Sequence, residues 1–144
     1  MRLFYYLVTV FYYMPKIFLI FASINGALAV MLGAFGAHGL KGKVSESLLA
    51  AYKTGVDYHL LHVLALMALA LLMLRAVSVP VWFIITGYCW MAGILLFSGS
   101  LYGLALGGPY WLGPVTPVGG LLLIVGWLCL TVGLTQSSFT HSSL

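Results

Sequence analysis

Two histidines, His59 and His62, lie three residues apart within an apolar stretch of the sequence. Because three residues span almost one helical turn, both imidazoles would lie on the same face of a helix. His38 closes an earlier apolar stretch, and Asp57 comes just before the pair. Neutral imidazoles bind transition metals, and histidines relay protons in membranes. The sequence therefore offers His38, His59 and His62 as a candidate metal or haem site. Asp57 adds a carboxylate beside it.

The alternative interpretation of these residues is structural. A His-x-x-His pair is common by chance, and an open zinc site needs three protein ligands. Polar side chains at the edge of a membrane also hydrogen-bond water, lipid headgroups or one another. No cofactor is therefore predicted, and metal or haem ligation stays as an alternative.

Hydroxyl groups accompany the histidines on the same predicted side of the membrane. In lipid, such groups bond their own helix or a neighbouring one, and a polar pocket at this end could hold a small ligand or a headgroup. The candidate polar site consists of His38, Tyr52, Thr54, Asp57, His59, His62, Ser98, Ser100 and Thr116. We find no nucleophile paired with a base and no phosphate-binding glycine loop, so a non-enzymatic role is favoured.

The composition identifies the solvent of the chain. Of 144 residues, 63% are hydrophobic and 6% are charged, and the mean hydropathy is +1.14. Soluble domains carry about 25% charged residues, so this chain is predicted to lie in a lipid bilayer. The six basic residues are scattered along the sequence, which excludes a nucleic-acid partner.

Four apolar stretches predict an all-α, polytopic bundle of four transmembrane helices at about residues 17–37, 58–74, 81–106 and 117–134. Pro15 suits the first turn of the first helix, and Thr116 suits the cap of the fourth. Together these helices form one domain over residues 16–134, followed by a mobile tail over 135–144. Residues 1–15 are either an interfacial extension or an upstream stretch, with translation starting at Met14.

The loop at residues 39–57 predicts one further element. Ser45 could cap a short helix there, and Leu48, Leu49, Tyr52 and Val56 would share its apolar face. We therefore expect a short amphipathic helix lying at the membrane surface. Three basic residues flank each predicted membrane side, so the charges leave the orientation open.

Small residues recur at helical spacing within three of the four spans. Glycine brings two helix backbones close together, and in lipid close packing and dispersion hold helices together. The residues predicted to pack helices are Gly26, Gly33, Gly99, Gly103, Gly107 and Gly126. They are expected to close the bundle within one chain, with dimerisation as the alternative.

Four ordered motifs resemble one known family. They are Asn25–Ala29 with Gly33–Leu40, Tyr52–His62, Leu96–Tyr102, and Leu112–Gly120 with Gly126–Trp127. Over about residues 16–134 the chain is similar to the YgdD/YwdK-like small membrane proteins of unknown function, a family with an animal transmembrane branch. The resemblance implies a multi-pass protein of four spans in the bacterial inner membrane or an organelle. It implies no activity.

Three functions remain open from the sequence. The first is a non-enzymatic bundle that binds a lipid or small molecule, or that supports a membrane complex. The second is a small transporter or channel, and the third is a metal- or haem-binding redox component that uses His38, His59 and His62. The expected partners are the lipid bilayer and a homo-oligomer or larger membrane complex.

Overall fold

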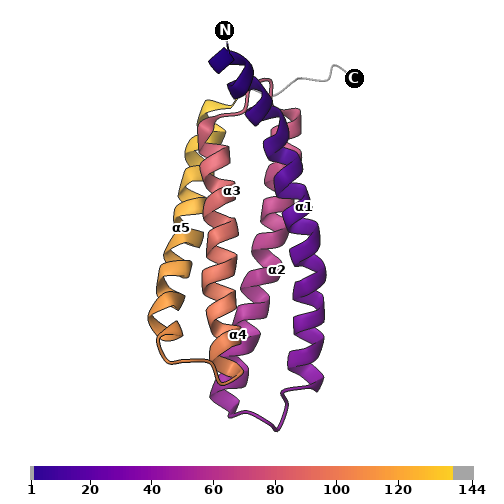
Figure 1. Ribbon diagram of the computed structural model, residues 1–144, viewed down its shortest axis with the longest axis vertical. Helices are drawn as coiled ribbons and strands as arrows, with labels where there is room; N and C mark the ends of the chain where they lie inside the picture. The colour runs from indigo at the N-terminus through magenta and orange to yellow at the C-terminus, as the bar shows by residue number, and fades with distance from the viewer. Residues whose placement is uncertain (1, 138–144) are drawn as a thin grey trace.

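The computed structural model describes the backbone of residues 2–137 and the side chains of residues 13–137. All its elements are helical (Figure 1): α1 Arg2–His38, α2 Glu46–Arg75, α3 Val81–Gly93, the π-helical turn η1 Ile94–Ser98, α4 Gly99–Ala105 and α5 Leu112–Gln136. The helices α3, η1 and α4 follow one another without a break and form one rod. Within the described part of the chain, four helical stretches are long and apolar enough to cross a membrane: Tyr13–His38, Glu46–Arg75, Val81–Ala105 and Leu112–Gln136. The predicted four-span, all-helical architecture is confirmed.

Helix α1 starts earlier than the sequence predicted. It runs from Arg2, so Pro15 lies inside it instead of in its first turn. A proline inside a helix removes one backbone hydrogen bond, but the helix continues through it here. The side chains of residues 1–12 lie outside the described residues. The interfacial extension and the alternative start at Met14 therefore stay predictions. The tail predicted over 135–144 begins two residues too early, since α5 runs to Gln136, and residues 138–144 lie outside the described residues.

The short amphipathic helix predicted in the first loop is not a separate element. Ser45 does cap a helix, since its hydroxyl accepts a hydrogen bond from the Leu48 N–H at 3.3 Å. That helix is α2, which continues unbroken to Arg75 because no proline interrupts it. Its first turns also pack inside the bundle, since Tyr52 is fully buried. The structure therefore places this segment in a long second span.

The start of the fourth span also differs from the prediction. Helix α5 begins at Leu112, so Thr116 lies within its second turn and does not cap it. The Thr116 hydroxyl instead bonds the Leu112 carbonyl oxygen one turn earlier. Pro114 falls in the first turn, where a missing N–H costs little, whereas Pro117 lies inside the helix and removes one backbone hydrogen bond.

The helices form two pairs that meet in the middle of the molecule. Helix α1 packs mainly on α2, and α5 packs mainly on α3, η1 and α4. The rod of α3, η1 and α4 then packs on α2, so the two pairs form one bundle (Figure 1). The main apolar core contains Phe18, Ala22, Val63, Leu66, Leu69, Ala70, Met73, Phe83, Trp90, Ile94 and Leu123. A second apolar cluster of Leu40, Tyr52, Val56, Tyr102 and Ala105 lies nearer the first loop.

Glycines lie at several of the helix contacts. Gly26 and Gly33 of α1 face valines of α2 so closely that an added Cβ would lie 3.4 and 3.3 Å from them. Gly126 of α5 lies directly against the Trp90 ring, and Gly103 lies against the Leu112 side chain. The tight packing of Gly126 holds α5 to the rod, as expected for small residues in membrane helices.

Gly99 and Gly107 correct the packing prediction. A Cβ added at either position would meet nothing within 4 Å, so neither residue lies at a helix contact. Gly107 instead adopts a φ of +82°, a conformation that favours glycine, just after α4 ends. The glycines at 99, 103 and 107 do not form one packing stripe, because α4 ends at Ala105 and Gly107 lies beyond it.

Candidate functional site

His59 lies inside the bundle and joins three helices. It is 4% exposed on α2, and its Nε2 atom lies 3.3 Å from Oδ1 of Asn25 on α1. Its Nδ1 atom lies 3.2 Å from the hydroxyl of Tyr102 on α4. The Asn25 amide nitrogen donates to the Phe21 carbonyl at 3.0 Å, so Oδ1 is the atom that faces His59. His59 therefore donates from Nε2 to Asn25, and its Nδ1 is hydrogen-bonded to the Tyr102 hydroxyl.

His62 lies one turn further along α2. Its Nδ1–H donates to the Tyr58 carbonyl oxygen at 2.8 Å. Its Nε2 accepts the indole N–H of Trp127 on α5 at 3.1 Å. Because a backbone carbonyl can only accept and an indole N–H can only donate, this pattern requires a neutral His62 imidazole. Each of the two histidines has both ring nitrogens in a hydrogen bond.

Two tryptophans enclose His62. The rings of Trp90 and Trp127 lie 4.8 Å apart between centroids, and each centroid lies 6.1 Å from that of His62. The Trp90 N–H donates to the Leu123 carbonyl on α5 at 3.3 Å. Neither tryptophan is among the predicted site residues, although Trp127 belongs to the fourth family motif. Their positions in the sequence did indicate a special role, because tryptophans of membrane proteins usually gather at the two membrane interfaces, whereas these two lie within spans.

Tyr52 supports the network from the loop side. Its hydroxyl donates to the Leu32 carbonyl on α1 at 3.0 Å, and its ring lies 4.9 Å from that of Tyr102. Gly36 and Gly55 make room for the two rings, since an added Cβ at either glycine would lie 3.0 Å or less from one of them. Tyr52 thus ties α1 to α2 and positions the ring of Tyr102 beside His59.

The predicted serines have different environments. Ser100 on α4 bonds the Thr116 hydroxyl on α5 at 2.7 Å, which joins two helices as expected for polar groups in lipid. Ser98 is 1% exposed and its hydroxyl makes no hydrogen bond with the described residues. It ends the π-helical turn η1, where the helix widens to a five-residue turn.

Other predicted site residues do not join this network. His38, Thr54 and Asp57 are exposed, and the Thr54 hydroxyl bonds the Ala50 carbonyl of its own helix. Among the described residues, no three His, Cys, Asp or Glu side chains are close enough together to hold a metal ion. The structure thus brings His59 and His62 to Asn25 and the tryptophans, and leaves His38 outside.

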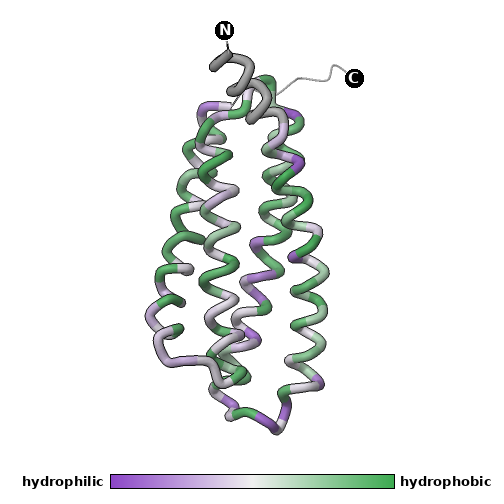
Figure 2. Tube along the Cα trace, viewed as in Figure 1, coloured by the Kyte–Doolittle hydropathy of each residue, from purple (hydrophilic) through white to green (hydrophobic). Residues whose placement is uncertain are grey.

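Figure 2 shows how this polar interior lies within an apolar molecule: hydrophilic positions gather in the lower half of α2, whereas α5 is largely hydrophobic. Large apolar side chains face outwards, including Val30 at 64% exposure on α1 and Leu64 at 63% on α2. Such exposure would be unfavourable in water but matches a lipid solvent. The histidines are therefore separated from the surroundings by apolar side chains.

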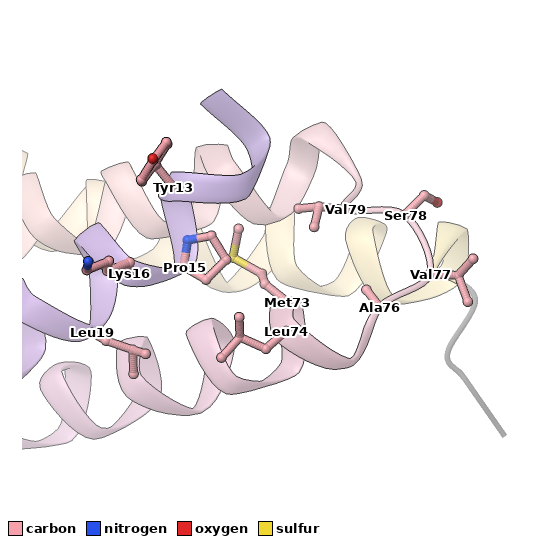
Figure 3. Close-up of a pocket in the computed structure, with 10 residues that line it drawn as sticks. All are labelled: Tyr13, Pro15, Lys16, Leu19, Met73, Leu74, Ala76, Val77, Ser78 and Val79. Carbon is pink, nitrogen blue, oxygen red and sulfur yellow. The ribbon is translucent and has the colours of Figure 1, made fainter. Parts of the chain in front are cut away.

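A separate groove lies at the opposite end of α2, near the N-terminus of the chain (Figure 3). We call it the α1–α2 groove, and its volume is about 980 Å³. Its walls come from α1, from the last turn of α2 and from the connection to α3: Tyr13, Pro15, Lys16, Leu19, Met73, Leu74, Ala76, Val77, Ser78 and Val79. Among the described residues that line it, Lys16 is the one that carries a charge, and most of the others are apolar.

Comparison with known proteins identifies the family. Residues 32–120 match the model of a protein family of unknown function, DUF423. The chain is 44% identical over 117 residues to the UPF0382 membrane protein YwdK of Bacillus subtilis, a match that covers 81% of this chain and 94% of YwdK. It is 42% identical over 118 residues to the UPF0382 inner membrane protein YgdD of Escherichia coli, covering 82% of this chain and 88% of YgdD. No solved structure matches the chain.

The matches agree with the motifs from which the resemblance was inferred. The four apolar helices and the inner-membrane name of YgdD support the predicted location. The protein is a multi-pass protein of the inner membrane and belongs to the DUF423 family.

Proposed function

We propose that this protein is a non-enzymatic helical bundle that binds a membrane lipid, and that the α1–α2 groove receives an acyl chain. One observation carries the proposal: a groove of about 980 Å³ opens between α1 and the end of α2 and is lined mainly by apolar side chains. Ligand sites commonly have volumes of about 300–1,000 Å³ and apolar walls with few polar groups. A lipid tail is the apolar ligand available to a groove in this location.

The interior of the bundle supports a role without chemistry. Every ring nitrogen of His59 and His62 is already in a hydrogen bond. A general base or a metal ligand needs a free nitrogen lone pair, and neither imidazole has one. The polar network therefore joins α1, α2, α4 and α5.

The experiment measures lipid retention by native mass spectrometry of the protein purified in mild detergent. We expect the wild type to carry one bound lipid. Leu19→Trp places a larger side chain in the groove, and Val77→Trp does so from the opposite wall. Ile24→Trp is the matched control, because Ile24 lies on the same helix as Leu19 and is 57% exposed.

Loss of the bound lipid in both groove variants but not in Ile24→Trp would support the proposal. Circular dichroism establishes that each variant is folded, and Val77 tolerates a large side chain because it is 67% exposed. A wild type that carries no lipid, or groove variants that retain it fully, would overturn the proposal.

A further inference from the structure

The α1–α2 groove carries a charge that the chain itself does not balance. Lys16 lines the groove and is exposed. The full sequence contains two acidic side chains, Glu46 and Asp57. Both lie in the first half of α2, whereas Met73 and Leu74 at its end line the groove.

The separation of these charges is large. Asp57 precedes Met73 by 16 residues, which corresponds to about 24 Å along a helix axis. Charges in contact with solvent are screened over about 8 Å at physiological ionic strength. Neither acidic side chain therefore neutralises Lys16, so an anionic ligand would complement its charge.

The position of Lys16 within the groove specifies the form of that anion. Lys16 lies one turn before Leu19 on α1, and Figure 3 shows these two side chains together at one end of a mainly apolar groove, with Val77 at the other end. A ligand that complements both the Lys16 ammonium and the apolar walls has a negatively charged group next to a long apolar chain. Basic pockets between membrane helices bind anionic lipid headgroups in this way.

We infer that the α1–α2 groove selects an anionic phospholipid, with the phosphate at Lys16 and an acyl chain beside Leu19. This inference rests on the proposed lipid binding and adds the class of headgroup. A lysine is suited to this role because its ammonium is a compact charge on a long, flexible apolar stem.

The test compares lipid identities on the full chain in nanodiscs. The discs contain equal amounts of phosphatidylglycerol and phosphatidylethanolamine, and native mass spectrometry measures which lipid stays bound. A second set replaces phosphatidylglycerol with cardiolipin. We expect the anionic lipid to be enriched about fivefold in each set, since one lysine near an anionic surface contributes about that factor.

Three variants assign the effect to Lys16. Lys16→Gln should abolish the enrichment while the total amount of bound lipid stays the same, and Lys16→Arg should retain it. Lys53→Gln removes an exposed charge from the other end of α2 and should change nothing. Equal loss in Lys16→Gln and Lys53→Gln would overturn the inference, because it would indicate general attraction to an anionic surface.

Two further outcomes separate this inference from the proposed function. Wild type that binds both lipids equally would overturn the headgroup selectivity and leave lipid binding intact, whereas wild type that binds neither would overturn both. Inorganic phosphate added alone should not displace phosphatidylglycerol, because it lacks the acyl chain. Complete displacement by phosphate would overturn the assignment to a lipid.

Discussion

The indole N–H of Trp127 donates a hydrogen bond to Nε2 of His62, and the two atoms lie 3.1 Å apart. This bond joins α5 to α2, whereas α5 otherwise packs mainly on α3, η1 and α4. It also uses the remaining ring nitrogen of His62, whose other nitrogen donates to the Tyr58 carbonyl. One pair of side chains thus links the two halves of the bundle and keeps this imidazole neutral.

Trp127→Phe is expected to destabilise the protein. The substitution keeps an aromatic ring but removes the N–H, so Nε2 of His62 loses its partner. Hydrogen bonds between membrane helices contribute about 0.6 kcal/mol on average, with larger values near 1.7 kcal/mol. We expect a loss of about 1 kcal/mol in the free energy of unfolding, measured by reversible denaturation in mixed micelles. Trp111→Phe is the control because Trp111 is 65% exposed, and a similar loss in both variants would contradict the role of the bond.

Gly126→Ala and Gly99→Ala are expected to have opposite effects. An added Cβ at Gly126 would collide with the Trp90 ring, whereas one at Gly99 would meet no atom within 4 Å. Overpacking a core costs about 1–3 kcal/mol. Alanine in an open helical position is favoured over glycine by about 1 kcal/mol. Thermal melts should therefore show a lower midpoint for Gly126→Ala and an equal or higher one for Gly99→Ala. A lower midpoint in both would show that Gly99 has a packing role after all.

Ser98→Ala and Ser100→Ala form a second matched pair on the same rod. The Ser98 hydroxyl is buried without a hydrogen-bond partner, so its removal relieves a desolvation cost. Ser100→Ala breaks the 2.7 Å bond to Thr116 and should cost about 0.5–1.5 kcal/mol. We expect Ser98→Ala to be neutral or stabilising in the same denaturation assay. Strong destabilisation by Ser98→Ala would indicate a buried water or ligand on its hydroxyl.

Purified protein is expected to contain no stoichiometric metal and no haem absorption. Both ring nitrogens of His59 and His62 form hydrogen bonds, and His38 is exposed outside the network. Elemental analysis and an absorption spectrum measure this directly. A bound metal that disappears in a His59→Ala, His62→Ala double variant would contradict the structural role of the pair and restore the metal hypothesis.

The sequence predicted the fold better than the site, and particular residues show why. Four long apolar stretches must cross the bilayer as helices because lipid offers no partners for backbone N–H and C=O groups. Local signals were less reliable at the ends of the helices. Ser45 capped as predicted, but Thr116 and Pro15 each lie inside a helix that starts earlier.

The candidate site was predicted in part. The one-turn spacing of His59 and His62 placed both imidazoles on the buried face of α2, where the structure has them. Asn25 was not among the predicted site residues, and the structure adds it as a partner of His59. Trp90 and Trp127 were not foreseen as partners of His62, because nothing in their local sequence indicates which helix they face. His38 was grouped with the pair because it lies at the end of a span, but its side chain is exposed.

By itself, the sequence determined that lipid is the solvent of this chain, that it forms four spans, and that its few polar groups gather near α2. These properties depend on composition and on the one-turn period of a helix, which are local. Only the tertiary structure decided that His62 meets Trp127 across 65 positions, that Gly126 rather than Gly99 packs, and that Lys16 lies on a groove with the end of α2. Those relationships depend on how the helices rotate and pair, and in lipid that choice is made by side-chain packing and hydrogen bonds between distant residues.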